Sequence, residues 1–185
     1  MRVLARILAL AGLLAAPAAA QVVTDGTVGA RTRLDGDVML IGSDLGRRKG
    51  ANLVHSFTRF EVRTGQVAAF NVPDGVGRVI GRVTGPSASN IDGIVSFIDP
   101  NFGPVAAEFF FFNPNGLVIG PSAEFRTSGT LRFSTGDTLM FADGARLSAD
   151  ADAPLRITSA APEAFGFLGG PGGQILLDGG RLPAQ

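Results

Sequence analysis

Residues 109–116 read Phe109-Phe110-Phe111-Phe112-Asn113-Pro114-Asn115-Gly116, an aromatic run followed at once by turn-forming residues. In a β-strand successive side chains point to opposite faces, so four phenylalanines cannot all enter one core. Two should point inward and stack. The other two need cover from a loop, from an extra-helical strand pair or from a partner. We therefore expect a strand that is buried on both faces rather than an exposed aromatic ridge.

The four residues after the phenylalanines have the chemistry of a type I turn. Asn at the first position and Pro at the second favour the bend, Asn tolerates the third position, and Gly closes it. The asparagine side chains can also bond to nearby backbone groups. Such a corner suits a solenoid, in which strands are joined by tight bends.

Short apolar runs separated by Gly, Asn, Asp or Pro recur on both sides of this segment. A short apolar run that is bounded by such turn-forming residues is typical of a β-strand. No convincing helix of ten residues follows residue 20, and residues 162–168 could form one helical turn at most. The sequence predicts an all-β fold, with strands near residues 38–41, 67–70, 78–84, 94–98, 109–112 and 117–119.

Internal similarity bears on the choice between sandwich, barrel and solenoid. Residues 131–135 are similar in type to residues 155–159, and residues 123–127 are more loosely similar to residues 145–149. A further apolar strand is expected at residues 174–177. Spacings near 20–24 suit the coils of a parallel β-helix, in which like residues stack about 4.8 Å apart. Chance similarity in a β-rich sequence would give the same pattern.

A longer ordered set of motifs is similar to the haemagglutination-activity, or two-partner-secretion, domain of filamentous haemagglutinin-like exoproteins. The similarity covers about residues 22–170. It rests on residues 52–60 (NLVHSFTRF), 65–70 (GQVAAF), 78–85 (RVIGRVTG), 89–93 (SNIDG), the phenylalanine run with its Asn-Pro-Asn-Gly turn, 117–120 (LVIG) and 159–169. Some members carry a second turn, Asn-Pro-Asn-Leu, and only residues 99–102 (DPNF) distantly echo it here.

The resemblance implies a right-handed parallel β-helix, a single-stranded solenoid with capping strands at its N-terminus. It implies a secretion-address domain that the polypeptide-transport-associated domains of an outer-membrane transporter recognise in the periplasm. A solenoid is stabilised by contacts between neighbouring coils, so its coils could fold one by one as they emerge. Unfolded strands could also add to a sheet edge of the transporter.

The resemblance also selects candidate residues for recognition by the transporter. These are Asn113, Pro114, Asn115, Gly116, Asn52, His55, Ser56, Phe57 and Phe60. The alternative is that they only hold the corners and the packing of the coils, and this alternative is the stronger one. For His55, the one histidine, a packed or capping role is favoured over a catalytic one.

The first twenty residues have the layout of a secretory signal peptide. Arg2 and Arg6 precede an apolar run at residues 7–16, and Ala18-Ala19-Ala20 forms a small-residue cleavage pattern. About ten apolar residues are too few to cross a bilayer, which needs roughly twenty. We expect a signal peptide at residues 1–20 and one domain at residues 21–185. The destination is then the cell surface or the medium of a Gram-negative bacterium, reached through the periplasm.

The composition argues against most enzymes. The chain has one His, no Cys and no Tyr, which removes most nucleophile–base pairs and metal clusters. We expect no catalytic residues, no metal and no cofactor.

The net charge and the absence of cysteine bear on other partners and on export. Without Arg2 and Arg6 there are 14 basic residues against 16 acidic ones, so no general attraction for nucleic acid is expected. Absence of Cys also keeps the exported chain free of crosslinks.

Two other functions stay open on the sequence alone. A short secreted β-helix could be a free-standing adhesin or matrix component that binds a host-cell or matrix surface, or the chain could be a truncated exoprotein. Less favoured is a carbohydrate-active enzyme, since Asp92, Asp99 and Glu108 could meet on adjacent coils.

Overall fold

The computed structural model describes residues 22–181. The predicted signal peptide lies outside these residues and stays a prediction. Within the described part, no helix is long and apolar enough to cross a membrane.

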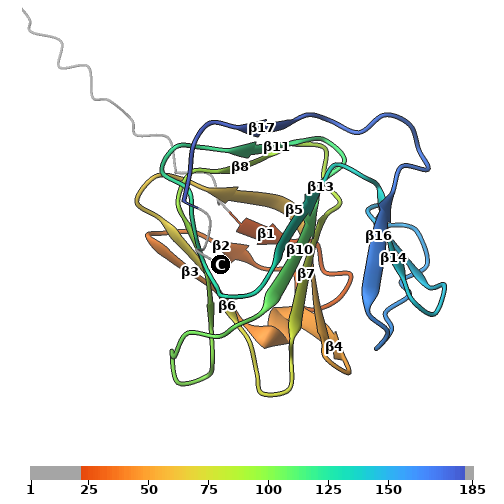
Figure 1. The fold of residues 1–185 in the computed structure, drawn as a ribbon, viewed down its shortest axis with the longest axis horizontal. Coiled ribbons are helices and arrows are strands. Elements are labelled where there is room, and N and C mark those ends of the chain that lie inside the picture. The colour runs from red at the N-terminus through yellow and green to blue at the C-terminus, as the bar shows by residue number, and fades with distance from the viewer. Residues whose placement is uncertain (1–21, 182–185) are drawn as a thin grey trace, which may run out of the picture.

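The chain winds as a three-sided solenoid, and Figure 1 looks along it so that the three faces are visible as a triangle. The parallel β-helix predicted from the sequence is therefore confirmed, with about three complete coils. The first face stacks the first part of β5 (Asn52–Val62), β7 (Arg78–Val83), β10 (Glu108–Phe112) and β13 (Leu131–Ser134). The second face stacks the end of β5, β8 (Ser89–Ile91), β11 (Leu117–Ile119) and β17 (Ile175–Leu177). The third face stacks β3 (Val38–Ile41), β6 (Val67–Asn71), β9 (Ile94–Ile98) and β12 (Glu124–Arg126).

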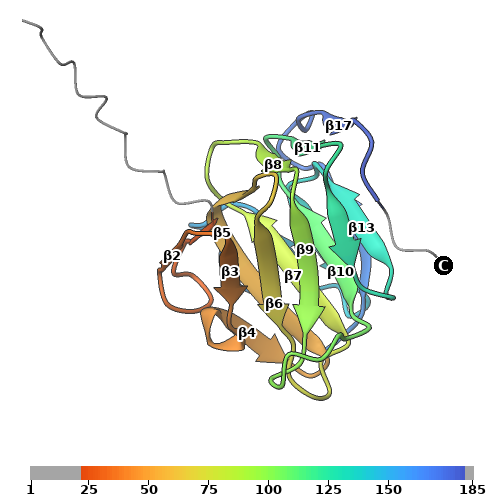
Figure 2. The same ribbon diagram turned by 90° about the vertical axis from the view of Figure 1, so that its left-hand side faces the viewer.

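Phenylalanine rings fill the interior of the solenoid. Phe70 and Phe97 are register partners on the third face, and their rings stack 5.4 Å apart at an interplanar angle of 9°. Phe60 and Phe111 approach to 4.9 Å from the first and second faces. Offset and tilted aromatic pairs add to the free energy of burying the rings. Phenylalanine thus stacks on phenylalanine between coils of the third face, whose strands β3, β6 and β9 lie side by side in Figure 2.

The phenylalanine run lies in β10 and is buried on both faces, as predicted. Phe109 and Phe111 enter the interior cluster, while Phe110 and Phe112 belong to a second apolar cluster outside the solenoid. An antiparallel sheet covers this outer side, with Phe165 in contact with both outward rings. The sheet consists of β15 (Arg146–Ser148), β14 (Thr138–Phe141) and β16 (Pro162–Gly166). Of the three kinds of cover considered from the sequence, the structure has strands outside the solenoid, and there are three of them rather than a pair.

Antiparallel strands also cap the N-terminal end of the solenoid. β1 (Val22–Thr24) pairs with β2 (Arg33–Leu34) and with the middle of β5. A short 3-10 helix, η1 (Ser43–Leu45), leads into β4 (Gly46–Lys49), which pairs antiparallel with the start of β5. Val22 in β1 and Leu45 in η1 are buried. The capping strands implied by the family resemblance are therefore present.

The internal repeats proposed from the sequence are wrong in detail. Residues 155–159 form no strand, and Leu131 stacks on Phe109 instead. β15, which was matched to residues 123–127, lies in the antiparallel sheet. The real offsets along the first face are 26, 30 and 22 residues, because the corner loops differ in length. Residues 174–177 do contribute the predicted strand, which stacks on β11. Residues 162–166 form strand β16 rather than a helical turn.

Burial on both faces of β10 predicts that an outward phenylalanine matters for stability. Phe112→Ala should lower the free energy of unfolding by about 3–5 kcal/mol, since it leaves a cavity beneath the antiparallel sheet. Phe167→Ala, at a ring that is 56% exposed, is the matched control and should have little effect. Urea unfolding followed by circular dichroism measures both. Equal small losses for the two variants would show that the antiparallel sheet does not cover this face.

Candidate functional site

The Asn-Pro-Asn-Gly segment forms the predicted turn between β10 and β11. The Gly116 amide donates to the Asn113 carbonyl at 3.0 Å, which closes the turn. The Asn113 side-chain oxygen also accepts from the Asn115 amide at 3.0 Å. Gly116 has φ +116°, a backbone conformation that residues with a Cβ rarely adopt, and a Cβ there would stand 3.0 Å from the Gln174 carbonyl oxygen. Glycine is therefore required at this corner by conformation and by space.

The turn is bonded to the corners that precede and follow it in the stack. Asn113 donates to the Ser87 carbonyl and to the Ser89 hydroxyl, both at 3.0 Å. Asn115 donates to the Gly85 carbonyl at 2.8 Å. On the opposite side the Gly173 amide donates to the Pro114 carbonyl at 2.7 Å. The two asparagine side chains thus replace backbone hydrogen bonds where the strands bend.

The four turn residues differ in their access to solvent. Asn113 and Gly116 are buried, Pro114 is partly buried, and Asn115 is exposed. Of these four residues, Pro114 and Asn115 are therefore the two that can contact another molecule when the chain is folded.

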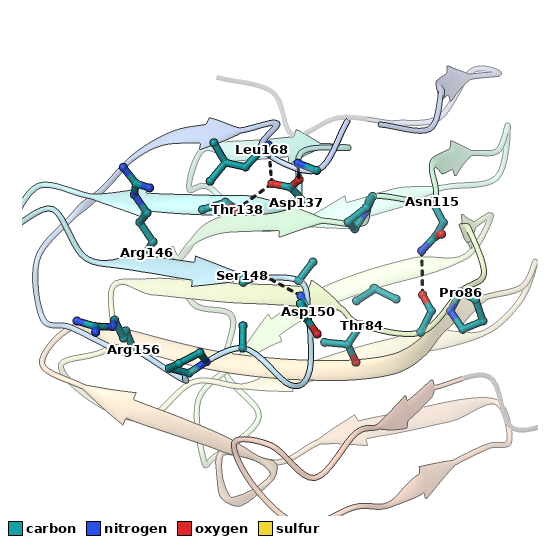
Figure 3. A pocket seen from close by; sticks show the side chains of 17 residues that line it. Thr84, Pro86, Asn115, Asp137, Thr138, Arg146, Ser148, Asp150, Arg156 and Leu168 are labelled. Atoms are coloured by element: carbon teal, nitrogen blue, oxygen red, sulfur yellow. Dashed lines mark hydrogen bonds between the residues drawn. The ribbon is translucent and has the colours of Figure 1, made fainter. Parts of the chain in front are cut away.

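An open groove of about 770 Å³ lies beside this turn (Figure 3). One wall is the corner at Thr84 and Asn115, and the other comes from the antiparallel sheet and the loops around it. Four charged side chains line it, namely Asp137, Arg146, Asp150 and Arg156. This groove was not predicted from the sequence, because its two walls come from separate parts of the chain.

The five other candidate residues lie in β5 and are buried. Asn52, His55, Ser56 and Phe57 are each 0% exposed and Phe60 is 1% exposed. Phe57 and Phe60 belong to the interior aromatic cluster, with ring centroids 5.1 Å apart. Asn52 points outward and donates to the Thr158 and Ala160 carbonyls at 2.9 and 2.7 Å, which fastens the strand to the segment before β16. These residues do not share a surface with the turn.

Ser56 belongs to a polar network that sequence reasoning missed. Its hydroxyl donates to Asp25 at 2.5 Å and accepts from the Arg82 guanidinium at 2.7 Å. Arg82 is only 1% exposed, and it also donates to the Thr27 hydroxyl and to the Ser148 carbonyl. The network therefore joins the N-terminal segment, the first two coils and the antiparallel sheet.

Burial and hydrogen bonding act in opposite directions on the charged members of this network. Burial raises the pKa of Asp25, but hydrogen bonds from Ser56, Thr27 and Thr84 outweigh it and leave the pKa below its ordinary value. Burial lowers the pKa of Arg82, opposed by the charges of Asp25 and Asp150. Both groups are charged at neutral pH. A buried charge of this kind is tolerated only while its partners are in place.

His55 points into the solenoid and makes no hydrogen bond of good geometry through either ring nitrogen. It packs against Phe70, with centroids 5.3 Å apart, and against Gly46, where a Cβ would come within 2.8 Å of the imidazole. Burial lowers the pKa of His55 to about 4, only partly offset by the nearby Leu45 carbonyl. The imidazole is therefore neutral and acts as a packed core residue, the role favoured from the sequence.

The carboxylates considered for sugar cleavage do not converge on one point. Asp92 and Asp99 flank β9 at opposite ends. Glu108 bonds to Arg132 at 2.6 Å instead. Among residues 22–181, no group of three or more His, Asp or Glu side chains could hold a metal ion.

The chain was compared with known protein families, curated proteins and solved structures. A family model described as the TPS secretion domain matches residues 20–176. No curated protein and no solved structure matches the chain.

Burial of neutral His55 predicts a loss of stability in mild acid. The folded-state pKa of about 4 lies below the ordinary value of 6.5, so the unfolded chain binds more protons between these values. Stability should fall by about 2 kcal/mol between roughly pH 7.5 and pH 5, above the range where carboxylates titrate. His55→Leu should remove most of this slope in urea unfolding at the two pH values. An unchanged slope would assign it to other groups.

The polar network predicts that Arg82 is essential to the assembled fold. Arg82→Met should lower the free energy of unfolding by about 3 kcal/mol or more, since it leaves the Asp25 carboxylate without its counter-charge. Arg126→Met is the matched control, because that side chain is 55% exposed in a surface ion pair. It should leave the unfolding transition almost unchanged. Equal losses in the two variants would contradict a special role for Arg82.

Proposed function

This chain belongs to the TPS secretion domain family, and from that membership we propose that it addresses an exoprotein to a dedicated outer-membrane transporter. The polypeptide-transport-associated domains of that transporter bind the chain in the periplasm of a Gram-negative bacterium. The chain then crosses the outer membrane and reaches the cell surface or the medium.

The observation that carries the mechanism is the burial of the recognition candidates in β5. Asn52, His55, Ser56, Phe57 and Phe60 are all inaccessible in the folded domain. A transporter could contact these side chains only before the solenoid forms. We therefore place recognition on the unfolded chain, with folding as a later step.

The strands supply the backbone groups for such recognition. In the folded domain β5 pairs with β7 and β8 on one edge and with β1 and β4 on the other. In the unfolded chain the same eleven residues have free amide and carbonyl groups. They could add to an exposed sheet edge of the transporter's periplasmic domain. Folding outside the cell would then withdraw these groups from the transporter and favour export.

The turn at residues 113–116 contributes differently to this mechanism. Its turn conformation is local, because Asn113 bonds to Asn115 and Gly116 within the turn itself. It can therefore form in a chain whose distant strands are still unpaired. Pro114 and Asn115 would then be presented to the transporter before folding, and they remain accessible afterwards.

A second candidate is a free-standing adhesin or matrix protein. The observation that favours it is the exposure of apolar side chains in β17, where Leu177 is 71% exposed. An adhesin should bind cells or matrix as the purified folded domain. A secretion-address domain should bind only its transporter.

Recognition of the unfolded chain can be tested by capture from urea. Residues 21–185 are diluted from urea into the transporter's periplasmic domains, and binding is compared with that of chain folded beforehand. The unfolded chain should bind and the folded chain should not. Asn115→Ala should weaken capture about tenfold while costing the folded domain about 1 kcal/mol, the loss of one exposed side chain's hydrogen bonds.

Two further variants separate recognition from folding. Asn101→Ala removes an exposed asparagine from the similar turn at Asp99, whose carboxylate accepts from the Asn101 amide at 2.7 Å. It should leave capture unchanged. Asn113→Ala removes a buried side chain that holds the corner and should cost about 3 kcal/mol of stability. Failure of the parent chain to bind, or equal binding by folded chain, would reject the proposal.

A further inference from the structure

The antiparallel sheet outside the solenoid ends in a free strand edge. β15 is the last strand of that sheet and pairs with β14 only. The residues that flank β15 bond toward β14, since the Ala149 amide donates to the Asp137 carbonyl and the Ala145 carbonyl accepts from the end of β14. Hydrogen-bonded and non-hydrogen-bonded pairs alternate along antiparallel strands. The backbone groups of Arg146 and Ser148 therefore point to the free edge.

This edge lies along the open groove beside the Asn-Pro-Asn-Gly turn. The Ser148 carbonyl, on the free edge, accepts from the Arg82 guanidinium of the solenoid. The next residues along the chain, Val83 and Thr84, line the groove, as do Arg146 and Ser148. The Arg146 amide and carbonyl and the Ser148 amide have no strand partner among residues 22–181. These backbone groups are therefore left for a ligand in the groove.

The two acidic side chains that line the groove already have partners of their own. The Asp137 carboxylate accepts from the Leu168 amide at 3.0 Å and from the Gly169 amide. The negative charge of Asp150 acts on the buried guanidinium of Arg82, where it opposes the lowering of the pKa by burial. Backbone amides and a buried cation thus offset the negative charge of the groove.

The two arginines that line the groove have no such partners. The four ion pairs found among residues 22–181 all involve other arginines. Arg146 and Arg156 are exposed, and Figure 3 places both at one end of the groove, with Asn115 at the other end. Guanidinium groups bind carboxylates through parallel hydrogen bonds. A ligand that lies along the groove therefore meets uncompensated positive charge at that end.

We propose that this groove binds an extended acidic peptide segment of another protein, which adds to β15 as a further strand and pairs its carboxylates with Arg146 and Arg156. A free strand edge pairs with another strand, which favours a peptide over other anions. Backbone bonds then supply affinity, and the arginines select acidic sequences. Because one wall is the docked antiparallel sheet, the site belongs to the folded domain. It is independent of transporter recognition, which concerns the unfolded chain.

Selection from a display library of random dodecapeptides tests the site with the folded chain of residues 21–185. Enriched peptides should carry Asp or Glu at alternate positions, since alternate side chains of a strand share a face. Fluorescence anisotropy of the most enriched peptide then compares variants. Arg146→Gln and Arg156→Gln should each weaken binding about tenfold, because each loses a charge-assisted pair. Arg126→Gln is the matched control, 55% exposed in a surface ion pair on β12, and should bind like the parent chain.

N-methylation of alternate peptide amides tests the strand pairing, because only every second residue of an added strand bonds to the edge. Methylation in one phase should weaken binding at least about tenfold, and methylation in the other phase should have little effect. Equal effects of the two phases overturn strand addition. Thermal unfolding establishes that each protein variant is folded. A library without enriched peptides, enriched peptides without acidic residues, or unchanged binding by either groove variant overturns the acidic-peptide site.

Discussion

Parallel backbone pairing between successive coils is the interaction on which the rest of this structure depends. A strand within the stack bonds to the coil before it and to the coil after it, so the corners between strands must bend within a few residues and still stack on their neighbours. Asn113 and Asn115 meet this requirement by bonding to backbone at Ser87 and Gly85 of the preceding corner. The same constraint demands caps at the ends, because an unpaired edge exposes both backbone groups and apolar interior.

The solenoid is not stabilised by neighbouring coils alone. Its first face is covered by the antiparallel sheet, which buries Phe110 and Phe112. Arg82 connects that sheet, through Ser148, to Thr27 at the N-terminus of the domain. The simple expectation that coils fold one by one is therefore incomplete, because Arg82 has its full set of partners only after residue 148 has joined the fold. Completion of folding is tied to parts of the chain that are far apart in sequence.

This arrangement agrees with the proposal that the chain is recognised unfolded and folds after transport. The motif at residues 52–60 lies in β5, the strand that forms the most pairings, and folding buries the five recognition candidates within it. In the proposed mechanism, the same segment serves the transporter as an unfolded strand and serves the folded domain as its central core strand. No conformational switch is needed beyond folding itself.

The sequence alone was sufficient for the all-β class, the turn at residues 113–116 and the burial of the phenylalanine run on both faces, because strand alternation and turn chemistry are local. The motifs shared with the family, which occur in the same order along the chain, additionally predicted the solenoid and its N-terminal cap. The coil register was not predictable, since corners of unequal length separate the strands and residues 155–159 copy a strand without forming one. Only the tertiary structure could show that Arg82 is buried: its outward position suggests a solvent-exposed side chain until the antiparallel sheet, contributed by residues more than fifty positions later, covers that face.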